Sequence, residues 1–203
     1  NNKWIDKTPK LCRQNQIDKN VEKRIIKLIK NKSKFADMIL VCDYGHKFIS
    51  KNISKEIKKS KKFLSVTAQI NSSNIGYHTI NKYSNSDLVV INESELRQEF
   101  KDNISDVNNL AKHLIINKKI KKLIVTQGKK GAFLVDNKFK SYFCPAFAKT
   151  LIDKVGAGDA MLSISSICLK LNFEPELALF LGSIAASSAV ETVGNKETIN
   201  FLK

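Results

Sequence analysis

The chain has 203 residues, of which 42% are hydrophobic and 8% aromatic, and it carries a formal net charge of +16. This composition excludes wholesale disorder and collagen-like or low-complexity structure, and it predicts one globular domain. The longest nearly apolar stretch, residues 177–190, is too short to cross a bilayer and is interrupted by glycine and serine, so no membrane partner is expected.

The positive charge comes almost entirely from lysine, since only Arg13, Arg24 and Arg97 are arginines. Arginine is favoured for reading bases and for clamping phosphates with two hydrogen bonds. The lysines are dispersed over polar helix faces and turns, without interleaved aromatic residues that could stack on bases. We therefore expect a solvated surface, with general attraction of anionic substrates as the second interpretation, and no nucleic acid as a partner.

The first four residues contain neither an initiator methionine nor the apolar core of a signal peptide, so we expect an internal piece of a longer, cytoplasmic chain. The cysteines Cys12, Cys42, Cys144 and Cys168 are far apart, and none has the spacing of a metal site. This favours a reduced setting, in which Cys42 and Cys168 pack as small hydrophobic residues.

Helices and strands alternate through the first part of the chain. Apolar residues at helical spacing from Val21 to Ile29, after a capping Asp18, predict an amphipathic surface helix. Residues 37–42 form an apolar run that predicts a buried strand with polar residues at its C-terminal end. The same patterns predict a helix over 49–60, strands over 63–67 and 88–91, a helix over 105–116 and a strand over 123–126. This alternation predicts a parallel sheet.

After Thr126 the pattern changes. Short apolar runs over 132–135 and 138–143, separated by Asp136-Asn137, predict a hairpin. Two long apolar helices are expected over 158–171 and 175–191. The predicted fold is a single α/β domain with a doubly wound, mostly parallel sheet, helices on both faces and an antiparallel hairpin edge. Its ligand is expected at the C-terminal ends of the strands.

The stretch D-K-V-G-A-G-D-A, residues 153–160, lies directly ahead of the first of these apolar helices. Gly156 and Gly158 allow the backbone to approach a ligand closely, and free N–H groups at a helix N-terminus can bind phosphate oxygens. Asp159 would repel a phosphate if it only bound one, so a sharper role is to accept a proton from an attacking hydroxyl. A capped helix start with glycines for close packing accounts for these residues equally well.

This stretch resembles the D-T-x-G-A-G-D signature of PfkB/ribokinase-type carbohydrate kinases, with Lys154 in place of the usual threonine. Residues 125–131 are similar to the T-x-G-x-x-G segment of that family and residues 92–95 to its N-x-x-E motif, in the order of the family. The three together are much more specific than a lone glycine-rich turn. Residues 43–46, 66–69, 74–80 and 189–195 resemble the kinase portion of nucleotidyltransferase–PfkB fusion proteins, relatives of bifunctional heptose kinase/nucleotidyltransferases.

The resemblance implies phosphoryl transfer from ATP, with Mg²⁺, to a hydroxyl of a sugar or sugar phosphate. Asp159 would be the base, and the backbone of Gly156, Ala157 and Gly158 would form the anion hole for the transferring phosphoryl. The remaining implied roles are loop support by Asp153, Mg²⁺ organisation through water by Asn92 and Glu95, nucleotide contacts by Thr126, Gly128 and Gly131, and an adenine pocket from Val190 to Asn195, where a monovalent-cation loop is an option.

Asp43 and His46 follow the end of a predicted strand, which is a position suited to a substrate or phosphate contact. An ordinary turn with an exposed imidazole is the alternative. Tyr44, between them, could pack or bind.

By the same resemblance, residues 1–203 are the C-terminal core of a PfkB-type kinase domain, without the N-terminal part that carries much of the sugar site and a β-rich lid. A nucleotidyltransferase domain is then expected in the full-length chain. The alternative function is a nucleotide-binding module without sugar kinase activity of its own. The sugar and the oligomeric state stay open, with a homodimer as one option.

Overall fold

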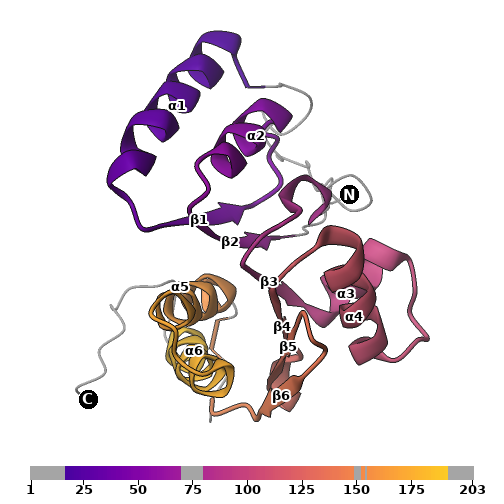
Figure 1. Ribbon diagram of the computed structural model, residues 1–203. Coiled ribbons are helices and arrows are strands. Elements are labelled where there is room, and N and C mark those ends of the chain that lie inside the picture. The colour runs from indigo at the N-terminus through magenta and orange to yellow at the C-terminus, as the bar shows by residue number, and fades with distance from the viewer. Residues whose placement is uncertain (1–16, 70–79, 149–151, 154, 192–203) are drawn as a thin grey trace, which may run out of the picture.

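The computed structural model describes residues 17–69, 80–148, 152–153 and 155–191 (Figure 1). The strands are β1 (Met38–Asp43), β2 (Phe63–Ala68), β3 (Leu88–Asn92), β4 (Lys122–Thr126), β5 (Ala132–Asp136) and β6 (Ser141–Cys144). The helices are α1 (Lys19–Lys32), α2 (Lys51–Lys59), α3 (Glu93–Phe100), α4 (Val107–Lys118), α5 (Ala157–Lys170) and α6 (Pro175–Val190). Three short 3₁₀ turns are η2 (Ser33–Phe35), η3 (Ile80–Tyr83) and η4 (Gly128–Lys130).

The described strands form one six-stranded sheet in which the spatial order follows the chain from β1 to β6. Strands β1 to β4 are parallel, and β5 and β6 add an antiparallel hairpin at one edge. In this register Asp43 lies beside Ala68, and Asn92 beside Thr126. The C-terminal ends of four strands therefore meet at one end of the sheet, as predicted.

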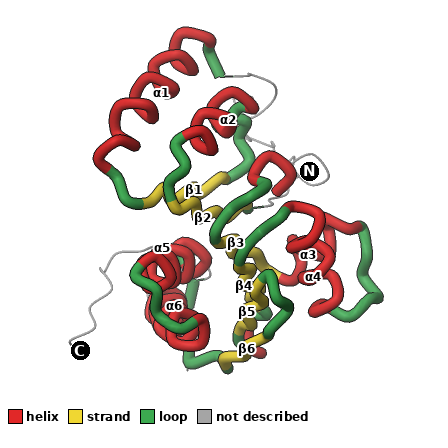
Figure 2. The backbone as a smooth tube through the Cα atoms, in the orientation of Figure 1, coloured by secondary structure: helices red, strands yellow, loops and turns green. Residues whose placement is uncertain are grey.

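Helices cover both faces of the sheet, which confirms the predicted layers (Figure 2). Val41, Val66 and Val89 face a core to which α1, α2 and α4 contribute, whereas Leu88 and Ile124 face a second core with α5 and α6. Because the order of the described strands never reverses, the crossover helices share one face. The second face is covered by the two helices that follow the hairpin.

The predicted helix starts are confirmed by their caps. Asp18 accepts hydrogen bonds from the backbone of Asn20 and Val21 at the start of α1, which satisfies two amides without an intrahelical partner. No residue of α1 is fully buried, as expected for a surface helix. Pro175 occupies the first turn of α6, where its missing N–H costs nothing.

Two local predictions are wrong. The hairpin does not turn on Asp136-Asn137 alone, since Val135 pairs with Ser141 and β6 starts three residues later than expected. The longer loop forms because the Asp136 carboxylate accepts the backbone N–H groups of Lys138 and Lys140, each at 2.9 Å. The helix α3 was not predicted at all.

The cysteines within the described residues, Cys42, Cys144 and Cys168, are free thiols. Cys168 packs in the second core, as predicted, and Cys12 lies outside the described residues. None of the described helices combines the length and the apolarity that a membrane crossing requires.

Candidate active site

The glycine-rich stretch forms the start of α5. Gly156 is the N-cap residue and has a φ of 88°, a left-handed conformation that glycine adopts without strain. Ala157, Gly158 and Asp159 make up the first turn, so their amides have no intrahelical acceptor. A Cβ atom built on Gly158 would have no atom of the described residues within 4 Å. Open space therefore lies against the backbone where an anion would bind.

The loop ahead of α5 is tied to the end of α6. The backbone N–H groups of Ile152 and Asp153 donate to the carbonyl of Val190 at 2.9 and 3.1 Å. The Asp153 carboxylate accepts the backbone N–H of Val155 at 2.9 Å, which forms a local turn. These contacts are consistent with the expected support of the loop by Asp153. They also bring Val190 next to the start of α5. Asn195 lies outside the described residues.

Asp159 meets the end of β1. The Tyr44 hydroxyl donates a hydrogen bond of 2.7 Å to Asp159 Oδ2, and this bond raises the pKa of Tyr44 to about 12, with burial adding to the shift. Burial, followed by the charge of Asp159, raises the pKa of the Cys42 thiol to about 12 as well. Both groups therefore keep their protons at neutral pH.

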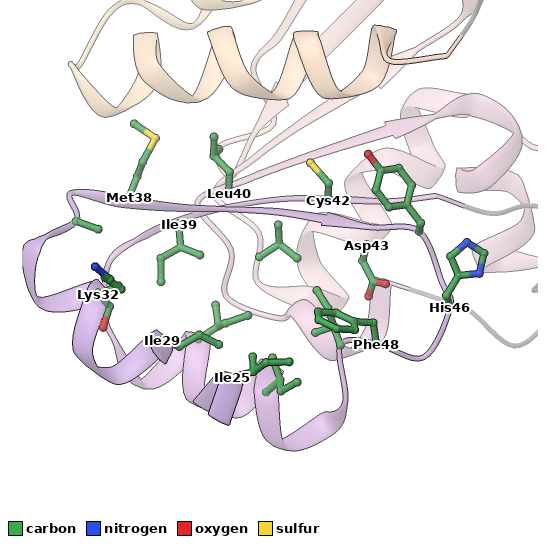
Figure 3. Close-up of a pocket in the computed structure, with 17 residues that line it drawn as sticks. Ile25, Ile29, Lys32, Met38, Ile39, Leu40, Cys42, Asp43, His46 and Phe48 are labelled. Atoms are coloured by element: carbon green, nitrogen blue, oxygen red, sulfur yellow. The ribbon is translucent and has the colours of Figure 1, made fainter. Parts of the chain in front are cut away.

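Asp43 is turned away from Asp159. Because side chains alternate along a strand, Cys42 points toward α5 and Asp43 toward the opposite face of the sheet (Figure 3). Asp43 is 2% exposed and binds Lys82 at 2.7 Å and the Tyr83 hydroxyl. Although burial opposes ionisation, these hydrogen bonds hold the pKa of Asp43 below its ordinary value. The carboxylate thus joins β1 to η3, whereas His46 is exposed beyond the turn.

A cavity of about 530 Å³ follows β1 and is lined mainly by aliphatic residues of α1, β1 and α2 (Figure 3). Cys42, Asp43, Tyr44 and His46 lie at one end of it. Since β1 pairs only with β2 among the described strands, its other edge is open along this cavity. An apolar lining offers few partners for sugar hydroxyls or phosphates, so the polar chemistry is concentrated at the strand end.

Asn92 and Glu95 form a capping box at the start of α3. The Asn92 side chain accepts the backbone N–H of Glu95 at 2.8 Å, and the Glu95 carboxylate accepts that of Asn92 at 2.9 Å. One oxygen of each side chain is therefore engaged locally. The described residues contain no group of three or more His, Cys, Asp or Glu side chains that could hold a metal directly.

The loop after β4 brings Thr126, Gly128 and Gly131 to the same end of the sheet. Gly128 and Gly131 have positive φ, and a Cβ on Gly131 would lie 2.1 Å from the carbonyl oxygen of Cys144. The backbone N–H of Gln127 donates to Gly131, and its side chain donates to Glu93 at 2.8 Å. This side-chain bond joins the loop to α3.

The contacts made by Cys42, Glu93 and Gln127 were not predicted from the sequence. The neighbourhood of Cys42 and Tyr44 was accessible in principle, because alternation along β1 puts positions 42 and 44 on one face. No signal in the sequence pairs Glu93 with Gln127, which are 34 positions apart.

A family model described as pfkB family carbohydrate kinase matches residues 18–200. The chain belongs to the pfkB family of carbohydrate kinases. This confirms the family on which the expected site residues were based. The three stretches that resemble its motifs lie at the start of α5, at the Asn92 capping box and in the loop after β4.

Curated relatives of this pfkB-family chain include the bifunctional protein HldE of Campylobacter fetus, which is 29% identical over 164 residues, or 79% of this chain and 35% of that protein. An uncharacterized sugar kinase of Buchnera aphidicola is 29% identical over 168 residues, or 81% of this chain and 52% of the relative. The chain therefore spans about a third to a half of the length of these relatives.

Solved structures show the same fold. Phosphofructokinase-2 of Escherichia coli in complex with potassium matches with a TM-score of 0.69 at 18% identity. The match covers 86% of this chain and 58% of the phosphofructokinase chain. Ribokinase of Arabidopsis thaliana complexed with ribose and ATP has a TM-score of 0.66 at 19% identity, over 89% and 55% of the two chains. The ribokinase-like fold is thus shown for this pfkB-family chain.

Proposed function

We propose that the protein containing this chain transfers a phosphoryl group from ATP to a hydroxyl of a sugar or sugar phosphate. The observation that carries the proposal is the placement of Asp159 in the first turn of α5, directly after the open backbone at Gly158. The membership of the chain in the pfkB family supports it. Binding determinants for the sugar are expected partly outside these residues, because the chain spans only part of its relatives.

In this proposal, Asp159 accepts the proton of the acceptor hydroxyl as the oxygen attacks the γ-phosphorus of ATP. The new oxygen–phosphorus bond forms while the bond to the β,γ-bridging oxygen breaks, and ADP leaves. The amides of Gly156, Ala157 and Gly158 stabilise the charge on the transferring group. Such preorganised donors contribute most of the acceleration, and the base adds about 10²- to 10⁴-fold.

The residues present suit ATP better than a directly bound metal. The amides at the α5 start and the turn after β4 offer backbone donors to phosphate oxygens. Asn92 and Glu95 already bond to each other, so they would hold Mg²⁺ through water, in keeping with its preference to retain a hydration shell. When bound, Mg²⁺ would neutralise phosphate charge. A monovalent cation beside Val190 to Asn195 stays an expectation.

The test is Asp159→Asn in the complete protein, which keeps the size of the side chain and removes the proton acceptor. We expect turnover to fall by at least about 100-fold while ATP affinity stays within a few-fold. Asp106→Asn is the matched control, because Asp106 caps α4 and asparagine caps equally well. Near-normal turnover of Asp159→Asn would refute the assigned base.

A nucleotide-binding module without sugar kinase activity of its own is the second candidate. It is favoured by the partial coverage of the relatives and by the edge of β1 that pairs with no other described strand. Calorimetric titration with Mg·ATP, beside a sugar panel, on residues 1–203 and on the complete protein separates the two. Binding without turnover by the shorter chain, with turnover in the longer one, would assign the missing function to segments outside this chain.

The partners of the whole protein follow from its relatives and stay proposals. HldE is named as a bifunctional protein, and the matched part is about a third of it. We therefore propose a nucleotidyltransferase domain in the complete chain. A cytoplasmic location is a separate proposal, which rests on the sequence alone. Mass measurement of the endogenous protein tests the first, and analytical ultracentrifugation tells a monomer from the homodimer that is one option.

A further inference from the structure

Tyr44, at the end of β1, contacts the proposed base Asp159 at the start of α5. Its hydroxyl lies 2.7 Å from Asp159 Oδ2, although the two residues are 115 positions apart in the chain. The Tyr44 side chain is 45% exposed and is carried by the first residue after β1. The tyrosine therefore approaches Asp159 from the end of β1 while keeping a large part of its surface open to solvent.

The other carboxylate oxygen of Asp159, Oδ1, has a different environment. Asp159 Oδ1 is buried, and no donor among the described residues meets hydrogen-bond geometry toward it. The Cys42 thiol lies on the same side, but a thiol is only a weak donor. The Tyr44 hydroxyl is thus the one strong donor that the described residues direct at this carboxylate.

The two titratable side chains that β1 places beside Asp159 are uncharged at neutral pH. Cys42 and Tyr44, both from the end of β1, remain protonated at neutral pH because their pKa values are raised. His46 is exposed two residues beyond Tyr44. Neither Cys42 nor Tyr44 therefore adds a charge beside the carboxylate that is proposed as the base.

We infer that Tyr44 is a positioning residue whose hydroxyl fixes the orientation of the Asp159 carboxylate toward the acceptor hydroxyl. This inference rests on the proposed function of Asp159 as a base. A carboxylate oxygen accepts more than one hydrogen bond, so Oδ2 can hold Tyr44 and the acceptor together. Tyr44 itself takes no proton from the substrate.

The kinetic test compares Tyr44→Phe, Asp159→Asn and the double variant in the complete protein. We expect Tyr44→Phe to lower kcat about tenfold with KM changed less than about twofold. The substitution removes a hydrogen bond to a charged group and keeps the aromatic ring. In the Asp159→Asn background, Tyr44→Phe should cause no further loss.

Tyr142→Phe is the matched control, since Tyr142 lies on β6, where its ring contacts Lys140. It should leave kcat and KM unchanged. Unchanged kinetics in Tyr44→Phe, a loss confined to KM, or an equal loss in both backgrounds would overturn the inference.

A second readout does not depend on activity. The difference in phenolate absorbance between the native protein and Tyr44→Phe isolates the titration of Tyr44 from that of the other tyrosines. At pH 11 this phenol should be largely un-ionised in the native protein and clearly more ionised when Asp159 is asparagine. Equal ionisation would refute the Tyr44–Asp159 contact, whereas an active Asp159→Asn enzyme with the expected titration would refute only the base.

Discussion

The side-chain amide of Gln127 donates a hydrogen bond of 2.8 Å to the carboxylate of Glu93. Glu93 also forms an ion pair with Arg97, with 2.8 Å between the guanidinium nitrogen and the carboxylate oxygen. The hydrogen bonds from Gln127 and Arg97 hold the pKa of Glu93 below its ordinary value. The loop after β4 is thereby fixed to the first turn of α3. The loop after β4 and the start of α3, which are both proposed to contact the nucleotide, are thus fixed relative to each other. The side chains that fix them, Gln127 and Glu93, need not touch the nucleotide.

Gln127→Leu should weaken ATP binding by about three- to tenfold, because removing one hydrogen bond to a charged group frees the loop from α3. Calorimetric titration of the complete protein measures this. Gln98→Leu, at an exposed position of α3, is the control and should bind ATP normally. Unchanged affinity in Gln127→Leu would show that the loop geometry does not depend on Glu93.

Asp43→Asn should lower the free energy of unfolding by about 2 kcal/mol, since Lys82 loses its counter-ion at a largely buried site. Urea unfolding at neutral pH measures the loss. Asp136→Asn is the control, because an asparagine in that hairpin can accept the same backbone bonds.

The effect of Asp43 should also depend on pH. Its folded pKa is lowered from the ordinary value of 3.8, so the stabilisation is present above that value and is lost as pH falls through the lower folded pKa. The difference between native protein and Asp43→Asn should therefore shrink below about pH 3.8. A difference that stays constant down to acid unfolding would show that packing, not charge, is involved.

Gly131→Ala should destabilise the protein far more than Gly128→Ala. Both glycines have positive φ, but a Cβ on Gly131 would clash with backbone atoms of Cys144 and Pro145, while one on Gly128 meets nothing within 4 Å. We expect about 1 kcal/mol for Gly128→Ala and about 3 kcal/mol or more for Gly131→Ala from urea unfolding. Equal losses would mean that the hairpin relaxes around the methyl group.

Gly158→Ala separates binding from folding at the start of α5. The new methyl would enter open space, so the free energy of unfolding should change by less than about 0.5 kcal/mol. ATP affinity or turnover should nevertheless fall by about tenfold or more, because the methyl occupies the place proposed for phosphate oxygens. Normal ATP binding and turnover would show that the space is not part of the nucleotide site.

Gly182→Ala should affect stability, in contrast to Gly158→Ala, because Gly182 has no free space around it. A Cβ there would lie 2.1 Å from Ser165 Oγ and 2.9 Å from Met161 Sδ, between the packed helices α5 and α6. We expect a loss of about 1–3 kcal/mol in the free energy of unfolding.

The sequence by itself determined the strands, most helices and the family. Apolar periodicity, the Asp18 cap and the proline at the start of α6 act within a few residues, so these features can be predicted without the fold. The helix α3 was missed although Asn92 and Glu95 have the spacing of a capping box, because that motif was interpreted only as a ligand site.

Tertiary structure alone decided which of the expected residues share a site. Strand alternation and the packing of α5 on β1 bring Tyr44 to Asp159, and the same alternation turns Asp43 to the other face, where Lys82 neutralises it. The contact of Gln127 with Glu93 depends on how β3 and β4 align. Such contacts join residues far apart in the chain through register and packing, which no local pattern of side chains encodes.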